Sequence, residues 1–404
     1  MGVNSNFDRS LSVVSDRVVE RLSHPTEQAR GLPNDAFTSD EFFQLEQKTL
    51  FANSWTFAAP ASDVPHPGDM KPIEVAGRSL ILARGQHGDI NVFHNVCPHR
   101  GARLLIEANS GQQTLVCPYH AWSFNLEGHL QGRPHYHGPD RHDRDSTDPQ
   151  RPCLFRVRSH TWYDWVFVNL SAKAPAFEDY VAPFVSEFQG FDLSVFKPGA
   201  YRRFEFDSNW KLTVENYCDF YHVFKVHPAL HQMMAQDARR AMQPGGAHLF
   251  NGYSFAGNGR GLVVDDDSPD LPMIAGLSDN LKNTMVYGNL FPNIAINVYP
   301  TNLQFVLFEP VAAGKSAMHM WFYFVGDAAD NETCRNARDT LCEEWADLNA
   351  EDLDICRRLQ EGRHCDAYDG GRLAPYWDSG TLHFHQQVAD AIHQRGHFAP
   401  SIDA

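Results

Sequence analysis

The chain has 404 residues, of which 43% are hydrophobic and 21% are charged, and its formal net charge is −16. This length predicts two or three domains, and the composition is typical of a globular protein. The negative charge argues against nucleic acids and anionic membrane surfaces as partners, because both are bound by clustered lysines and arginines.

The sequence contains no run of 18 apolar residues and no apolar region near its first residue. We therefore expect neither a membrane span nor a signal peptide. Eight cysteines in a long chain without an export signal are expected to be reduced thiols, some of them in a metal site. Together these features predict a cytoplasmic protein.

The first 34 residues are polar and predict a poorly packed arm with one helix over 16–22. An amphipathic helix is expected next, over 39–51, with Ser39 as its N-cap. We assign residues 1–52 to an N-terminal arm and helix that pack on the catalytic domain.

Residues 53–172 show short alternating runs interrupted by glycine and proline, which is typical of an all-β domain. The predicted strands lie at 70–75, 79–83, 90–93 and 162–170.

Residues 173–404 predict a larger α+β domain. A strand from Tyr201 should lead into a helix that carries residues 215–227. Residues 231–284 lack periodicity and predict a long irregular excursion. Three strands should follow, at 294–299, 304–309 and 317–325. Two helices are expected after them, at 331–361 and 386–394.

Two cysteines and two histidines form two half-motifs in the all-β segment, Cys97-x-His99 and Cys117-x-x-His120. Two thiolates and two imidazoles suit either zinc or an iron–sulfur centre. Structural zinc sites usually pair two cysteines within one half, whereas each half here has one cysteine and one histidine. This symmetry favours a Rieske [2Fe–2S] cluster over zinc.

The runs C-P-H-R-G from Cys97 and C-P-Y-H-A-W from Cys117 resemble the Rieske signature of the ring-hydroxylating oxygenase α-subunit family. The resemblance implies that the two cysteines bind one iron of the cluster. It also implies that His99 and His120 bind the other iron, and that Trp122 shields the cluster.

His222 and His227 end the run N-W-K-L-T-V-E-N-Y-C-D-F-Y-H-V-F-K-V-H, which begins at Asn209. A spacing of five does not fit one face of a regular helix and requires a bend or a π-type bulge. Two histidines and a carboxylate form the facial triad of non-haem Fe(II) oxygenases. The run resembles the family's mononuclear-iron motif, and the resemblance then extends from about Ser39 to His397.

The resemblance places the third iron ligand, an aspartate, on a late helix. Asp352 is our choice, with Glu351 and Asp354 as alternatives because the sequence does not fix the helical phase. In the family, the acid that corresponds to Asp219 links the Rieske histidine of one subunit to the mononuclear-site histidine of its neighbour. Such a carboxylate would fix the tautomer of a ligand such as His222.

The resemblance implies a terminal oxygenase that activates O2 with a [2Fe–2S] cluster and Fe(II). The chain has neither a G-x-G-x-x-G run after a strand nor a four-cysteine ferredoxin set, so a separate NAD(P)H-dependent reductase or ferredoxin must supply electrons. The expected fold is α+β, with an N-terminal all-β Rieske domain and a C-terminal helix-grip domain. The expected assembly is a homotrimer, with an added β-subunit left open. A Rieske electron carrier is the alternative of another class.

Five aromatic residues are candidates for the substrate pocket: Tyr217, Phe220, Phe224, Tyr287 and Phe291. Such rings bind a quaternary ammonium by cation–π attraction or stack on an aromatic substrate. The sequence after His227 resembles glycine betaine and carnitine oxygenases, so hydroxylation or N-demethylation of a betaine-type amine is the first hypothesis. The second is oxygenation of an aromatic carboxylic acid, whose carboxylate an arginine would anchor. The arginine candidates are Arg202, Arg203, Arg239, Arg240 and Arg260.

Overall fold

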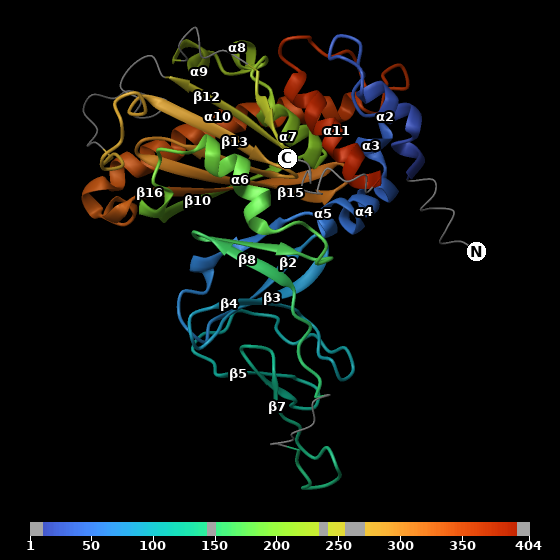
Figure 1. Ribbon diagram of the computed structural model, residues 1–404, viewed down its shortest axis with the longest axis vertical. Helices are drawn as coiled ribbons and strands as arrows, with labels where there is room; N and C mark the ends of the chain where they lie inside the picture. Colours follow the sequence, from blue (N-terminus) through green and yellow to red (C-terminus); the bar gives the residue numbers. More distant parts are fainter. Residues whose placement is uncertain (1–10, 144–150, 234–240, 255–270, 394–404) are drawn as a thin grey trace, which may run out of the picture. The chain divides into compact units, whose positions relative to one another are not determined.

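The structure is a computed structural model that describes residues 11–143, 151–233, 241–254 and 271–393 (Figure 1). Its contacts divide the chain into two compact units, residues 51–174 and a larger unit made of residues 1–50 and 175–404. The sequence placed these boundaries after residues 52 and 172. The smaller unit is all-β and the larger one combines an antiparallel sheet with helices, so the predicted α+β class is confirmed.

In the described part of the smaller unit, the strands form three antiparallel sheets of three strands each, in the orders β1-β9-β8, β2-β3-β4 and β5-β6-β7. The strands are β1 Thr56–Pro60, β2 Met70–Val75, β3 Arg78–Arg84, β4 Ile90–His94, β5 Thr114–Val116, β6 Ser123–Asn125, β7 Leu130–Gly132, β8 Arg158–Trp162 and β9 Trp165–Asn169. The three predicted strands at 70–75, 79–83 and 90–93 are confirmed as β2, β3 and β4.

The predicted strand at 162–170 is confirmed over Trp165–Asn169, as β9, but the chain reverses at its start. Trp162 ends β8 and Trp165 begins β9, and the two strands pair as a hairpin. Tyr163 has a φ of 53°, the left-handed conformation of a tight turn. Alternating apolar residues on both sides of the turn resembled one longer strand.

The larger unit contains a seven-stranded antiparallel sheet in the order β10-β16-β15-β14-β13-β12-β11. The strands are β10 Phe196–Phe206, β11 Gln243–Gly245, β12 His248–Ser254, β13 Thr284–Leu290, β14 Ile294–Val298, β15 Asn302–Ala312 and β16 Lys315–Val325. The expectation of an irregular excursion over 231–284 is therefore wrong over 243–254, where β11 and β12 form a hairpin that extends the sheet, whereas residues 271–283 contain neither helix nor strand, as expected. The two strands were missed because they depend on pairing with each other and with β13, and not on a residue pattern of their own.

Helices cover both faces of this sheet. The helices of the described residues are α2 Asp16–Leu22, α3 Asp35–Thr38, α4 Asp40–Lys48, α5 Leu50–Asn53, α6 Phe177–Glu187, α7 Trp210–Cys218, α8 Val223–Val226, α9 Pro228–Met233, α10 Arg335–Gly362 and α11 Ser379–His393, and all but α5 belong to the larger unit. Short 3-10 turns lie at Ala61–Asp63, Leu193–Val195, Gly326–Ala329 and Glu332–Cys334.

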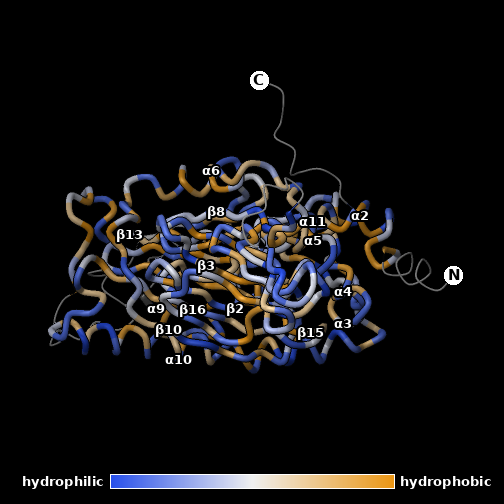
Figure 2. The backbone as a smooth tube through the Cα atoms, turned by 90° about the horizontal axis from the view of Figure 1, so that it is seen from below, coloured by the Kyte–Doolittle hydropathy of each residue, from blue (hydrophilic) through white to orange (hydrophobic). Residues whose placement is uncertain are grey.

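Neighbouring residues of β13 show which helix covers which face. A side chain at Gly288 would meet Phe184 of α6, whereas the ring of Tyr287 lies against Tyr217 of α7. Because successive residues of a strand point to opposite faces, α6 and α7 cover opposite sides of the sheet. The tube in Figure 2 carries hydrophilic segments along outer helices such as α3 and α10.

The N-terminal segment is well packed in its described part, so the expectation of a poorly packed arm is wrong. Val14, Val18 and Leu22 are buried, and α2 contacts α11. The backbone N–H of Leu32 donates a hydrogen bond to Nδ1 of His385 at 3.2 Å. The apolar face of one short helix was too small to reveal this docking in the sequence. The predicted N-cap Ser39 is confirmed, since its hydroxyl accepts from the N–H of Phe42.

Candidate active site

Cys97 and Cys117 each open a loop of the same shape. In both loops the N–H of the cysteine donates to the carbonyl five residues later, at 2.8 Å, and the N–H four residues later donates back to the cysteine carbonyl, at 3.0 Å. The residue at that fourth position, Gly101 or Ala121, has a positive φ. The two half-motifs therefore share one backbone loop, in which the cysteines are at the same position, whereas His99 follows its cysteine by two residues and His120 by three.

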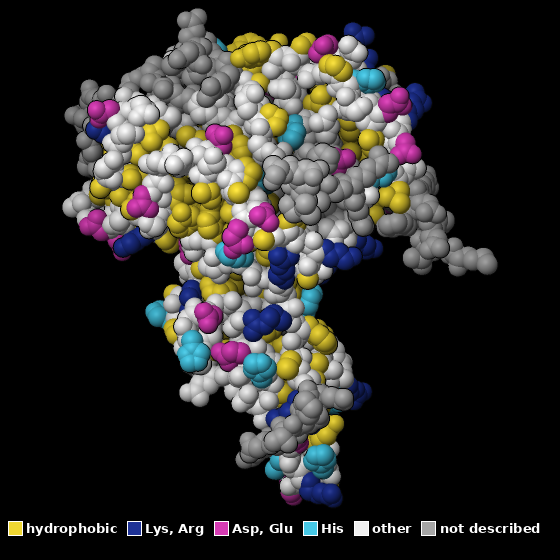
Figure 3. Space-filling model, in the orientation of Figure 1, with side chains coloured by type: hydrophobic (Ala, Val, Ile, Leu, Met, Phe, Trp, Pro, Cys, Tyr) yellow, Lys and Arg dark blue, Asp and Glu magenta, His cyan; other side chains and the backbone are white. Residues whose placement is uncertain are grey.

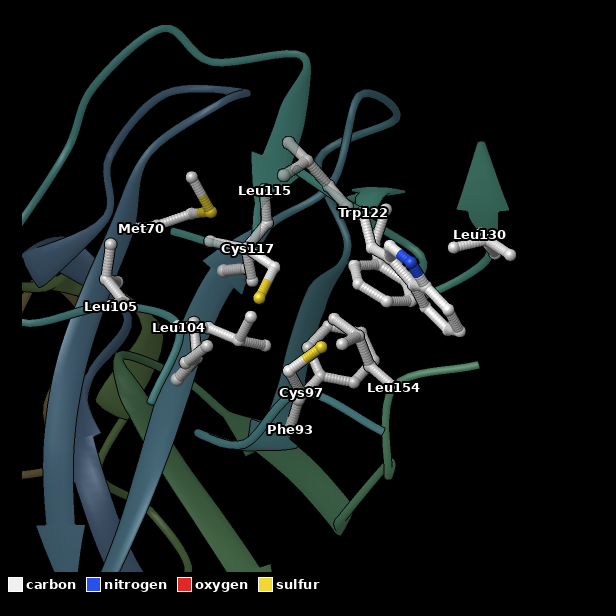
Figure 4. Close-up of a cluster of buried hydrophobic side chains, with 14 residues drawn as sticks. Met70, Phe93, Cys97, Leu104, Leu105, Leu115, Cys117, Trp122, Leu130 and Leu154 are labelled. Carbon is white, nitrogen blue, oxygen red and sulfur yellow. The ribbon is translucent and has the colours of Figure 1, made fainter. Parts of the chain in front are cut away.

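The loops bring the four side chains together. Cys97 and Cys117 are buried in one core cluster with Trp122 (Figure 4). The rings of His99 and His120 are 4.7 Å apart between centroids. Partial desolvation in the loop, together with the neighbouring His120 and Arg100, lowers the pKa of His99. Nδ1 of His120 is buried and has no hydrogen-bond partner in the described part of the chain.

Trp122 lies flat on one of these histidines. Its ring stacks on His99 with centroids 4.4 Å apart and an interplanar angle of 5°. The guanidinium of Arg133 lies over Trp122 and over Tyr136, and its Nε donates to Asp143 at 2.6 Å. A buried ion pair thus supports the ring that covers His99.

The second constellation lies where helix α7 ends. The predicted helix over 215–227 is interrupted, since α7 stops at Cys218 and Asp219 is extended, which agrees with the bend that the histidine spacing required. The carboxylate of Asp219 accepts from the N–H groups of Tyr221 and His222, at 2.6 and 3.3 Å, which offers the backbone an alternative to helical bonds. The short helix α8 then separates His222 from His227, so the break accommodates the spacing of five.

Both histidines point one ring nitrogen at the same carboxylate of helix α10. Nε2 of His222 is 3.6 Å from Oδ1 of Asp352, and Nε2 of His227 is 3.0 Å from the same oxygen. The ligand atoms of the three residues all lie within 4.8 Å of one another. Oδ1 of Asp352 is buried, and no described residue forms a hydrogen bond with it. Two imidazole nitrogens and one carboxylate oxygen fit a divalent iron.

Each of the two histidines contacts a second carboxylate through its other ring nitrogen, Nδ1. Nδ1 of His222 lies 3.2 Å from Asp219, and Nδ1 of His227 lies 2.7 Å from Glu351. Donation from each Nδ1–H leaves the Nε2 lone pair facing Asp352. Burial alone would lower the pKa of His227, but Asp352 and Glu351 raise it above its ordinary value.

The acids near Asp352 have different positions. Glu351 contacts the back of His227 and does not face the centre of the group. Asp354 lies at the surface, where it pairs with Arg357 at 2.5 Å and Arg358 at 2.6 Å. Sequence reasoning missed the supporting position of Glu351, because it considered this residue only as a competing ligand.

Three of the five aromatic candidates contact one another where α7 packs on the sheet. Tyr217 and Phe220 each contact the ring of Tyr287, with centroids 6.0 and 5.6 Å apart. We call these residues the aromatic trio. Phe224 is instead 55% exposed on the short helix α8, and Phe291 is buried against Phe384 of α11.

The two described arginine candidates lie on β10, away from the trio. Arg203 pairs with Glu205, and Arg202 donates to the carbonyl of Tyr201. The other three, Arg239, Arg240 and Arg260, lie outside the described residues.

Another group of possible metal ligands, His135, Asp140 and His142, is fully exposed in the smaller unit. Figure 3 shows several histidines on the visible surface of this unit. Nδ1 of His135 accepts from the N–H of Asp140, and Nδ1 of His142 accepts from the N–H of His135. These contacts shape the loop, and we assign the group no metal.

Comparison with known proteins agrees with this arrangement. Residues 193–394 match the family model described as ring hydroxylating alpha subunit (catalytic domain), and residues 54–142 match the Rieske [2Fe-2S] domain. The chain belongs to the ring-hydroxylating oxygenase α-subunit family. The family resemblance predicted from the sequence is therefore confirmed, and the electron-carrier alternative is not supported.

Individual proteins that are similar to this chain are oxygenases of the same kind. The carnitine monooxygenase oxygenase subunit of Acinetobacter pittii (strain PHEA-2) is 27% identical, over 84% of this chain and 87% of the relative. A quaternary ammonium Rieske monooxygenase in complex with L-carnitine matches with a TM-score of 0.73 at 23% identity, over 92% of this chain and 98% of that one. Naphthalene 1,2-dioxygenase from Rhodococcus sp. matches with a TM-score of 0.69 at 18% identity, over 94% and 99% of the two chains.

The chain is thus a Rieske-type oxygenase, an oxidoreductase. Its two domains imply a [2Fe–2S] cluster and a mononuclear Fe(II), as predicted, and the two donor sets described above fit these groups. Members of the family act on a small-molecule substrate with a separate reductase. None of the described helices is long and apolar enough to cross a membrane.

Replacing Arg133 with leucine should weaken the smaller unit and its hold on the cluster. The change leaves the buried carboxylate of Asp143 beside only Arg151, at 3.5 Å, and removes the cation over Trp122. Loss of one partner of a buried pair costs about 3 kcal/mol. We expect a lower thermal midpoint and faster loss of cluster absorbance in the presence of a chelator. Arg141→Leu, an exposed change in the same loop, is the control, and equal behaviour of the two variants would contradict the expectation.

Proposed function

We propose that the two donor sets hold the two iron groups. The ligands of the cluster are Cys97, His99, Cys117 and His120, and those of the mononuclear iron are His222, His227 and Asp352. The matching cysteine loops and the convergence of three ligand atoms on one point support this assignment.

The bound iron groups supply electron storage and O2 activation. The chain's own residues position the ligands for this chemistry. Asp219 and Glu351 hold the two histidine rings by their Nδ1–H groups, so that both Nε2 atoms face Asp352. Such carboxylates orient a ligand ring and make it a stronger donor.

We further propose that the substrate is a quaternary amine of the betaine type, which the enzyme hydroxylates or N-demethylates. The aromatic trio is the observation that carries this proposal, because it lies next to the residues that lead to the metal ligands. Tyr217 is two residues before Asp219, and Phe220 is two residues before His222. Aromatic faces attract a quaternary ammonium, which cannot donate conventional hydrogen bonds. The names of the carnitine monooxygenase relatives support the same class.

The working assembly that we propose is a homotrimer fed by a separate reductase or ferredoxin. Asp219 would then connect the cluster histidine of one subunit to His222 of the next. The exposure of part of the Asp219 side chain is compatible with a contact from a neighbouring subunit. A cytoplasmic location belongs to the same proposal, because the cluster thiols need a reducing compartment.

A substrate panel tests the proposed class. With a reductase, NADH and O2, the enzyme should release formaldehyde or a hydroxylated product from methylated quaternary amines, including carnitine and glycine betaine. Benzoate and salicylate represent the aromatic acids. Hydroxylated aromatic products, together with no turnover of any amine, would overturn the proposal in favour of ring oxygenation.

If the aromatic trio binds the ammonium group, loss of one of its rings should raise the KM for the substrate. Tyr287→Leu should raise the KM for the quaternary amine about tenfold, because one aromatic face of the cation site is lost. Tyr287→Phe keeps the ring and should stay close to wild type. The two variants are compared by steady-state kinetics, and similar KM values for both would contradict a cation–π role.

A further inference from the structure

Two buried amide side chains lie on the sheet beneath the aromatic trio. Asn297 of β14 and Gln304 of β15 are fully buried, with 0% exposure each. Tyr287 is opposite Asn297 in the strand register, and Asn297 is opposite Gln304. Side chains of directly opposite residues share one face of a sheet, so the amide pair and the trio lie on the same side.

The amide pair is tied to the trio by hydrogen bonds. Nδ2 of Asn297 donates to the hydroxyl oxygen of Tyr217 and to Oε1 of Gln304, the latter at 3.1 Å. Both N–H groups of Asn297 are thereby used. Oδ1 of Asn297 and Nε2 of Gln304 are buried, and neither has a hydrogen-bond partner among residues that the structure describes. Leaving such atoms unpaired is costly, which points to a ligand group that completes them.

The two unpaired atoms have complementary chemistry. Oδ1 of Asn297 accepts a hydrogen bond, and Nε2 of Gln304 donates one. A ligand that satisfies both must offer one donor and one acceptor close together. An alcohol does this with a single atom, whereas a carboxylate has no proton to donate and a methylammonium group has no acceptor.

We propose that Asn297 and Gln304 form a subsite that recognises a hydroxyl group of the substrate. The alcohol O–H donates to Asn297, and its oxygen accepts from Gln304. This inference rests on the proposed function and adds a preference to it. The enzyme should favour a hydroxylated quaternary ammonium carboxylate over its deoxy analogue.

L-carnitine and γ-butyrobetaine form a suitable pair, because they differ only in one hydroxyl group. Binding of both to the intact enzyme is measured by calorimetry, which needs no turnover, and kcat/KM is measured in parallel. The wild type should favour L-carnitine about tenfold, the effect of one or two net hydrogen bonds. Asn297→Leu and Gln304→Met, which keep the side-chain size, should lose most of this preference. The readout is the ratio of the two affinities, because Asn297→Leu also removes the hydrogen bond to Tyr217 and can change the binding of both ligands.

Asn302→Leu is the matched control. Asn302 is a buried amide of the same strand as Gln304, and its Oδ1 is also without a hydrogen-bond partner among the described residues. It differs in position, because its Nδ2 donates to Thr301 at the strand end and it does not lie opposite Asn297 in the register. This control should keep the wild-type preference. Thermal midpoints of all variants identify any that fail to fold, and whichever of Asn297→Leu and Gln304→Met folds then carries the test by itself.

The outcomes separate the subsite from the proposed function. An unchanged ratio in folded Asn297→Leu and Gln304→Met enzymes overturns the subsite, as does a complex in which the amide pair binds only water. If neither quaternary amine binds to the wild type, the proposed function fails. The subsite is then judged on salicylate and benzoate, where equal affinity of the wild type for both overturns it as well.

Discussion

Replacing Asp352 with alanine should abolish oxygenase turnover while leaving the absorption spectrum of the Rieske cluster intact. Asp352 is the carboxylate that both Nε2 atoms face, at 3.6 and 3.0 Å. Without it, two histidines alone remain to bind the mononuclear iron. Iron content should then fall from about three to about two atoms per chain, since a [2Fe–2S] cluster holds the other two. Iron analysis, visible spectra and product formation check the three parts of this expectation.

Asp354→Ala is a control from the same helix. Asp354 is exposed and pairs only with surface arginines, so its loss should change neither iron content nor turnover, and stability by less than about 1 kcal/mol. His222→Ala should behave like Asp352→Ala. If Asp352→Ala kept its third iron and its activity, or if Asp354→Ala lost both, the ligand assignment would be wrong.

Replacing Lys211 with methionine should produce a large loss of stability. Nζ of Lys211 contacts Oε1 of Glu46 at 2.6 Å, and both side chains have 0% exposure. The substitution leaves Glu46 buried with only the indole N–H of Trp210, at 3.2 Å. Breaking a buried pair in this way costs about 3–5 kcal/mol. Denaturant-induced unfolding followed by tryptophan fluorescence measures the change.

A double variant at Glu46 and Lys211 shows how much of the lost free energy of unfolding comes from the unpaired charge and how much from the ion pair itself. Burial raises the pKa of Glu46 and lowers that of Lys211, so each group is costly without the other. Replacing both, in Glu46→Leu/Lys211→Met, removes both desolvated charges and should recover most of the stability that Lys211→Met loses. A single variant that unfolds like the wild type would contradict the prediction. Because Lys211 lies in the first turn of α7 and Glu46 belongs to α4, the pair also anchors the helix that carries Tyr217.

The sequence by itself determined the features that depend on neighbouring residues. Each cysteine loop closes on itself through two backbone hydrogen bonds within six residues, so its motif was readable without any knowledge of the rest of the chain. The strand at 70–75 and the N-cap at Ser39 are local in the same sense. His222 and His227 were found for the same reason, even though the helix expected to carry them is broken.

Features that depend on distant partners were decided only by the tertiary structure. Glu351, Asp352 and Asp354 are acids of one helix, and only the packing of α10 against α7 sets which of them faces His227, more than a hundred residues earlier in the chain. The same holds for the aromatic candidates, where Phe224 lies at the surface and the ring of Tyr287 lies against Tyr217.

The amide pair shows the physical reason most clearly. Nothing in the runs around Asn297 and Gln304 distinguishes these amides from other polar residues of a strand. Strand register brings them opposite each other, and helix packing adds Tyr217 to their hydrogen bonds. Local sequence specifies turns, caps and ligand loops because their interactions close within a few residues. Which acid of α10 faces the two histidines, and which amides of the sheet meet Tyr217, depend on contacts that form only when the sheet and its helices pack together.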